Sequence, residues 1–121
     1  MRKTALLAVL LLAACSGGSS SGTGLVTTTG SPDAQTATVE MHNDLKFHPS
    51  TVDARVGTVT LDVRNTETVP HDLVFDDAKL GKTRTVDGKS DEKLTVTFDK
   101  AGTYRFTCTF HSGMDGKVVV S

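Results

Sequence analysis

The stretch "YRFTCTFHSGM", residues 104–114, joins a strand pattern to a group of metal-binding side chains. Successive side chains of an extended strand point to opposite faces, so Tyr104, Phe106 and Cys108 share one face. We therefore expect the Cys108 thiol to point inward, with the core aromatic rings, at the end of a strand. His111 and Met114 follow immediately, and this places three potential metal ligands in one short loop.

The same alternation of apolar and polar residues runs through residues 36–121 and predicts an all-β domain. Val59, Leu61 and Val63 share one face of a run whose other face is polar. Turn-forming residues separate such runs: Pro49, Gly57, Gly81, Gly88, Gly102, Gly113 and Gly116. We expect an antiparallel Greek-key sandwich or barrel of about seven or eight short strands. One helical turn is expected near residues 77–81.

The N-terminal segment is typical of an exported protein. Arg2 and Lys3 precede the apolar run 5–14, as in a secretory signal, and this run is too short to span a bilayer. It ends in "LAAC", residues 12–15, which resembles a bacterial lipobox. Cys15 is then expected to carry lipid and to begin the mature chain. Ordinary signal cleavage beside a buried Cys15 is the alternative.

A Ser/Gly/Thr-rich stretch follows Cys15 and buries too little apolar surface to fold, so it is interpreted as a tether. The sequence thus divides into a lipoprotein signal peptide (1–14), a lipidated cysteine with a flexible linker (15–35) and a folded domain (36–121).

The charge balance argues against nucleic acid as a partner. Loss of residues 1–14 removes Arg2 and Lys3, so the 13 basic residues become 11 against 14 acidic ones, and the net charge moves from -1 to -3. The chain has no basic cluster with interleaved aromatic residues. It also has no Gly-rich phosphate loop and no Ser/His/Asp spacing, and we expect no enzymatic activity.

Cysteine counting draws attention to Cys108. If Cys15 is acylated, Cys108 is an odd thiol in an exported protein, and such a thiol is reactive, intermolecular or metal-ligating. A disulfide between Cys15 and Cys108 is the alternative, although a bridge to a flexible tail adds little stability.

His71 has the same inward direction as Cys108. In "VPHDLVF", residues 69–75, it shares a face with Leu73 and Phe75 at the start of a strand. A thiolate, two imidazoles and a thioether suit copper, because a His2Cys site with a weak axial Met is a blue-copper centre. Zinc fits less well, since Met is a poor ligand for it and a catalytic zinc site would lack an evident general base. Taken singly, the two histidines also suit a turn or a surface loop, and Met114 suits the core.

The segments "PHDLVF" (70–75) and "YRFTCTFHSGM" (104–114) together resemble the plastocyanin and amicyanin branch of the cupredoxins. The Cys-x2-His-x2-Met spacing is most similar to amicyanin, and "KFHPSTVDARVG" (46–57) resembles an early strand of the family. The resemblance covers residues 39–120. It implies one type 1 copper ion with His71, Cys108 and His111 as equatorial ligands and Met114 as the axial ligand.

Two positions depart from the family pattern. Phe110 stands where proline usually precedes the second histidine, and Asp72 stands where asparagine is common. The resemblance implies that the side chain at position 72 ties the two ligand loops together, with Thr109 as its expected partner.

The ligand set and the lipobox together predict a membrane-tethered carrier that cycles between Cu(II) and Cu(I), and the resemblance implies that the edge of His111 is exposed in an apolar patch. We expect a monomer on the extracytoplasmic side of a bacterial membrane, in the periplasm or on the cell-wall side, with transient redox partners docking near His111. The alternative is an extracytoplasmic copper-binding module for storage, delivery or sensing. A multicopper enzyme needs further histidines, and only His42 and His48 remain, which we interpret as surface residues.

Overall fold

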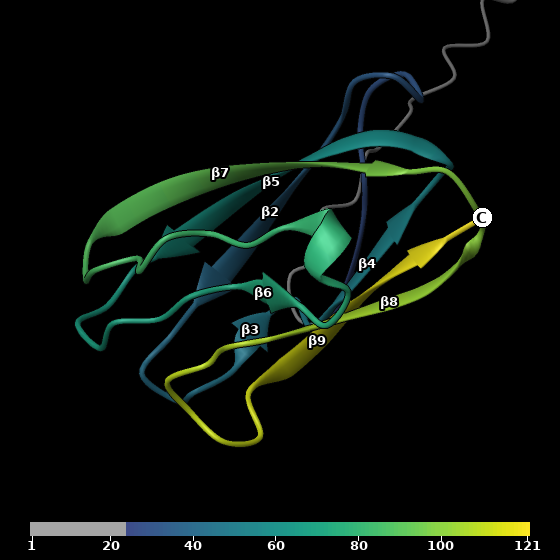
Figure 1. Cartoon of the computed structure of the whole chain (residues 1–121). Coiled ribbons are helices and arrows are strands. Elements are labelled where there is room, and N and C mark those ends of the chain that lie inside the picture. The colour runs from purple at the N-terminus through teal and green to yellow at the C-terminus, as the bar shows by residue number, and fades with distance from the viewer. Residues whose placement is uncertain (1–23) are drawn as a thin grey trace, which may run out of the picture.

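Two β-sheets pack face to face in the computed structural model, which describes residues 24–121 (Figure 1). The first sheet has the order β1-β4-β9-β8-β6 and the second the order β3-β2-β5-β7. The strands of the first sheet are β1 (Leu25–Thr27), β4 (Thr51–Ala54), β9 (Asp115–Val120), β8 (Gly102–Thr107) and β6 (Val74–Phe75). Those of the second are β3 (Phe47–His48), β2 (Gln35–Met41), β5 (Gly57–Asn65) and β7 (Ser90–Phe98).

The core lies between the sheets and follows the alternation predicted from the sequence. Val59, Leu61 and Val63 of β5 are fully buried, and Phe106 of β8 is buried opposite them in the other sheet. The ring of Phe106 packs edge-on against Phe47, with ring centroids 4.9 Å apart. The all-β sandwich is therefore confirmed.

The direction of the strands differs in part from the antiparallel arrangement that we expected. The pairs β1–β4, β2–β5 and β4–β9 are parallel, so both sheets are mixed. The reason is the path of the chain, which passes from β2 through β3 and then β4 of the other sheet before it returns to β5 beside β2.

The single helical turn is confirmed as the 3-10 helix η1 (Ala78–Leu80), capped by the Asp77 side chain.

The folded part begins before residue 36, because residues 24–35 of the expected linker take part in it. Strand β1 pairs with β4, and Gln35 is fully buried at the start of β2. The Gln35 side chain accepts hydrogen bonds from Thr28 and from the Arg55 backbone, and donates to the Pro32 and Arg55 carbonyls. A buried amide, backbone pairing and the partly buried Val26 thus hold this Thr- and Gly-rich stretch in the fold.

The expected leader, the lipidation site Cys15 and the first part of the linker lie outside the described residues. Within residues 24–121, no helix is long and apolar enough to cross a bilayer.

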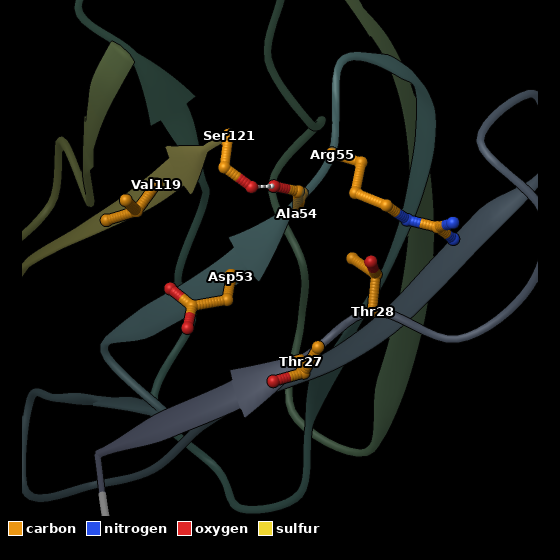
Figure 2. Close-up of a pocket in the computed structure, with 7 residues that line it drawn as sticks. All are labelled: Thr27, Thr28, Asp53, Ala54, Arg55, Val119 and Ser121. Carbon is orange, nitrogen blue, oxygen red and sulfur yellow. Dashed lines mark hydrogen bonds between the residues drawn. The ribbon is translucent and has the colours of Figure 1, made fainter. Parts of the chain in front are cut away.

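The two ends of the sandwich differ in character. The loop between β8 and β9 lies at one end, and the C-terminus lies at the other (Figure 1). Near the C-terminus a hollow lies over the ends of β1, β4 and β9, where Ser121 donates to the Ala54 carbonyl (Figure 2). The hollow is lined by Thr27, Thr28, Asp53, Ala54, Arg55, Val119 and Ser121.

Asn65 organises the loop that leads from β5 to His71. Its side chain is 1% exposed, and its amide nitrogen donates to the Val69 and Val86 carbonyls at 2.7 and 2.9 Å. Its amide oxygen accepts from the Glu67 backbone N–H at 3.2 Å. Val86 in turn exchanges two backbone hydrogen bonds with His71. The loop is therefore held by one buried side chain before the chain reaches His71.

Substitution of Asn65 by alanine is expected to lower the free energy of unfolding by about 1–3 kcal/mol, because three hydrogen bonds of a buried side chain are lost. Asn43→Ala provides a matched control. Asn43 makes a similar set of bonds to Thr68 and Val69 of the same loop, but it is exposed to water, which replaces those bonds. Urea unfolding of both variants is the measurement, and an equal loss of stability in the two would contradict this account.

Candidate metal centre

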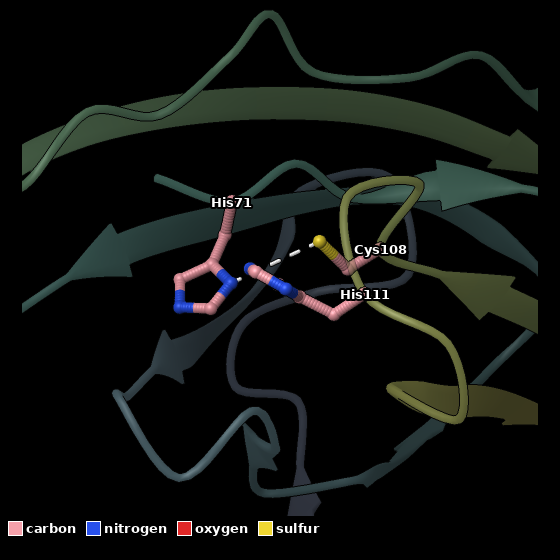
Figure 3. A group of neighbouring side chains, drawn as sticks. All are labelled: His71, Cys108 and His111. Carbon is pink, nitrogen blue, oxygen red and sulfur yellow. Dashed lines mark hydrogen bonds between the residues drawn. The ribbon is translucent and has the colours of Figure 1, made fainter. Parts of the chain in front are cut away.

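Three side chains from different segments converge at the end of the sandwich that holds the β8–β9 loop. His71 precedes β6, Cys108 directly follows β8, and His111 lies in the loop between β8 and β9 (Figure 3). One donor atom of each lies within 4.8 Å of the others. The Cys108 Sγ is 3.8 Å from Nδ1 of His71, and the ring centroids of the two histidines are 4.9 Å apart.

Strand pairing explains why residues so distant in sequence meet here. β6 pairs antiparallel with β8, with Val74 opposite Thr107. Continuation of this register places Leu73 beside Cys108 and Asp72 beside Thr109, so the segment before β6 runs along the segment after β8. On the other side, the Cys108 N–H donates to the Met114 carbonyl at 3.0 Å, which closes the ligand loop.

Burial differs among the four residues that the sequence indicated. His71 is fully buried, Cys108 is 3% exposed and Met114 is 1% exposed, whereas His111 is half-buried. Within residues 24–121, Cys108 has no disulfide partner. Met114 is tied to this loop through its backbone, since its N–H donates to the His111 carbonyl at 3.4 Å. The donors thus lie at the edge of the core, with His111 on the side that faces solvent.

Backbone carbonyls orient both imidazoles. Nε2 of His71 donates to the His42 carbonyl at 3.0 Å, and Nε2 of His111 donates to the Pro70 carbonyl at 3.2 Å. A carbonyl only accepts hydrogen bonds, so the ring proton of each histidine is on Nε2 and the lone pair is on Nδ1. Hydrogen bonds of this kind commonly fix the tautomer and the ring orientation of metal-binding histidines.

Desolvation sets the protonation of the cluster without metal. Burial lowers the pKa of His71, and the nearby His111 lowers it further. Burial also raises the pKa of the Cys108 thiol, although backbone groups of Asp72 and Phe110 beside the sulfur act in the opposite direction. The metal-free cluster therefore holds a neutral imidazole and a protonated thiol. A metal that binds to the sulfur must release the thiol proton.

Asp72 joins the segment of His71 to that of Cys108. One carboxylate oxygen accepts from the Thr109 N–H at 2.7 Å, and the other accepts from the Thr109 hydroxyl at 2.5 Å. This is the contact that the family resemblance implied for these two positions. It anchors the residue that directly follows the cysteine.

Sequence reasoning missed one contributor to the cluster. His42 was interpreted as a surface residue, and its half-buried imidazole lies away from Cys108, yet its main-chain carbonyl holds His71. A main-chain contact leaves no signature in residue type. Of the two apolar residues next to His111 in this loop, Phe110 is 49% exposed, with its ring centroid 6.4 Å from that of His111, whereas Met114 is buried.

Comparison with known proteins assigns the family. A family model described as a cupredoxin-like domain matches residues 4–120. The chain belongs to the cupredoxin-like family. Amicyanin-alpha of Methylorubrum extorquens is 35% identical over 79 residues, which cover 63% of this cupredoxin and 65% of that protein.

A second relative is the chloroplastic plastocyanin of the moss Physcomitrium patens. It is 36% identical over 101 residues, which cover 73% of this chain and 60% of the plastocyanin. The cupredoxin described here therefore spans less than two thirds of either relative.

Among solved structures, the cupredoxin resembles auracyanin A, a "blue" copper protein of Chloroflexus aurantiacus. The TM-score is 0.63, and the match covers 73% of this chain and 99% of auracyanin A. Sequence identity is only 18%, so the likeness supports the fold alone.

Proposed function

We propose that this cupredoxin is a membrane-tethered one-electron carrier that binds one type 1 copper ion through His71, Cys108 and His111, with Met114 as a weak fourth ligand. The observation that carries the proposal is the convergence of a buried thiol and two imidazoles within 4.8 Å in a protein of this family. The relatives named plastocyanin and amicyanin, which share the family, support it.

The donor set fits copper better than zinc. A thiolate and a thioether are soft ligands, imidazole suits copper, and His71, Cys108 and His111 together offer one sulfur and two nitrogens. Structural zinc sites usually have four cysteine, histidine or carboxylate ligands, and Met114 is a poor substitute for a fourth. Copper bound to such ligands supplies a reversible one-electron couple.

In electron transfer, the polypeptide would keep the metal-ligand atoms in fixed positions. The His42 and Pro70 carbonyls fix the two rings, and Asp72 fixes the backbone after Cys108. Burial of His71 and Cys108 excludes water from one side of the cluster. Donors that are already fixed move little when the charge of the site changes, and this favours fast transfer.

His111 and Phe110 form the solvent-exposed side of the cluster. His111 is half-buried, and the exposed ring of Phe110 lies beside it. We propose that transient redox partners dock at this spot, because His71 and Cys108 are buried whereas His111 is half-buried. Weak interfaces of small area are typical of redox encounters.

Copper loading tests the proposal. The full-length chain with Cu(II) should absorb visible light intensely and show a narrow copper hyperfine splitting in its EPR spectrum, because the thiolate is a ligand. Cys108→Ala should abolish the colour, and His48→Ala, whose imidazole lies outside the cluster, should leave it unchanged. A colourless complex with an ordinary tetragonal spectrum, or no reversible voltammetric wave, would contradict the carrier function.

The charge of Asp72 is expected to favour Cu(II) over Cu(I). Asp72→Asn should raise the reduction potential at pH 7 by roughly 40–90 mV, equivalent to about 1–2 kcal/mol for one electron. Ligation should survive, since an amide oxygen still accepts from the Thr109 N–H and the amide nitrogen donates to its hydroxyl. Asp76→Asn removes an exposed carboxylate from the same segment and is the control. An unchanged or lowered potential in Asp72→Asn alone would rule out this charge effect.

The membrane tether rests on the lipobox-like "LAAC" and on the apolar run before it. We propose that lipid on Cys15 anchors the protein to the extracytoplasmic side of a bacterial membrane. Cys15→Ser should move the protein from the membrane fraction to the soluble fraction, whereas Ser20→Ala should not. Mass spectrometry of the N-terminal peptide should find acyl chains on Cys15, and an unmodified Cys15 in the mature protein would refute the anchor.

A further inference from the structure

The hairpin of β2 and β3 places four polar side chains on its outer face, away from the cysteine cluster. Met41 of β2 is fully buried, so the residues on either side of it, Glu40 and His42, point outward. The antiparallel register sets His48 of β3 directly opposite Glu40. Asp44 lies in the turn between the two strands. Backbone geometry therefore brings two imidazoles and two carboxylates together.

Contacts between these side chains are close. The rings of His42 and His48 stack with centroids 4.1 Å apart and an interplanar angle of 17°. Nε2 of His42 lies 2.9 Å from a carboxylate oxygen of Glu40, and Nε2 of His48 lies 2.8 Å from one of Asp44. One donor atom each of His42, Asp44 and His48 lies within 4.8 Å of the others.

We infer that this group, His42, Asp44 and His48 with Glu40 as a fourth ligand, is a second metal site, for a divalent cation of the zinc class. Imidazole nitrogens and carboxylate oxygens are ligands of zinc, and four of them complete a tetrahedral shell. With neutral imidazoles the group carries two negative charges, which a dication cancels. The set contains no sulfur, so it has no preference for soft Cu(I).

A bound cation requires the two rings to leave their stacked arrangement, because a metal lies near the plane of each imidazole that binds it and two nearly parallel planes do not meet at the ring nitrogens. The donor atoms of His42, Asp44 and His48, which lie within 4.8 Å of one another, must also move to tetrahedral spacing. Two ligands at zinc distances of 2.0–2.2 Å and a tetrahedral angle are about 3.3 Å apart. The two N···O contacts of 2.8 and 2.9 Å open by roughly half an ångström when a cation takes the place of the shared proton. The side chains have room for this, because His42, Glu40, His48 and Asp44 are 30%, 41%, 41% and 46% exposed.

The site is separate from the cysteine cluster in ligands but connected to it by the backbone. The imidazole of His42 belongs to the second site, whereas its carbonyl accepts the hydrogen bond from His71. A cation on the hairpin therefore binds to the same residue that orients a donor of the first cluster. The existence of the second site does not depend on the function proposed for the first.

Zinc binding to the second site is tested in the full-length chain with Cys15→Ser, Cys108→Ser and His111→Gln, which has no thiol and a broken first cluster. Equilibrium dialysis against Zn(II) should give one bound ion. His48→Gln or Asp44→Asn in this background should weaken binding at least tenfold. Asp76→Asn, an exposed carboxylate elsewhere, should leave the affinity unchanged.

Proton NMR gives a second readout that also monitors folding. The test background keeps three of the four histidines, and Zn(II) should shift the imidazole resonances of His42 and His48 more strongly than those of His71. No bound zinc, or an affinity that His48→Gln, Asp44→Asn and His42→Gln all leave unchanged, would overturn the inference. These outcomes are independent of the copper spectra, so the two sites can fail separately.

Discussion

The hydrogen bond from Nε2 of His71 to the His42 carbonyl is the contact on which the geometry of the candidate metal centre depends. It determines that Nδ1, the other ring nitrogen, faces Cys108, and it does so in a fully buried position where an unpaired polar group is costly. Desolvation then keeps the ring neutral and ready to bind a metal. The donor is thus oriented by the fold before any metal arrives, which lowers the cost of binding.

Strand pairing positions the other segments of the cluster. The β6–β8 register extends beyond the strands to the Asp72–Thr109 contact, and the β8–β9 pair extends to the bond between Cys108 and Met114. Each ligand segment is therefore the continuation of a strand whose buried side is set by the core. The backbone of these segments is therefore held in place by the paired strands of the sandwich.

Much of this arrangement could be predicted, because the alternation of apolar and polar residues along a strand determines which side chains point into the core. The inward orientation of His71 and Cys108 follows from their apolar neighbours two residues away, and the family resemblance pointed to the Asp72–Thr109 contact. The parallel pairing of β2 with β5 could not be predicted, since strand direction depends on the path between the sheets. Strand β1 and the role of the His42 carbonyl were missed for a related reason, because backbone hydrogen bonds leave no mark on composition.

The central place of β9 in its sheet has a consequence for biogenesis. β8 and β6, which lead to Cys108 and His71, reach β4 only through β9, and β9 is synthesised after every other strand of that sheet. A chain that lacks β9 can still pair β6 with β8 and bring His71 near Cys108, but this part of the sheet then has no connection to β4 and β1. The last strand of the sheet to be synthesised is therefore the one that joins the segments of the candidate metal centre to the rest of the sheet.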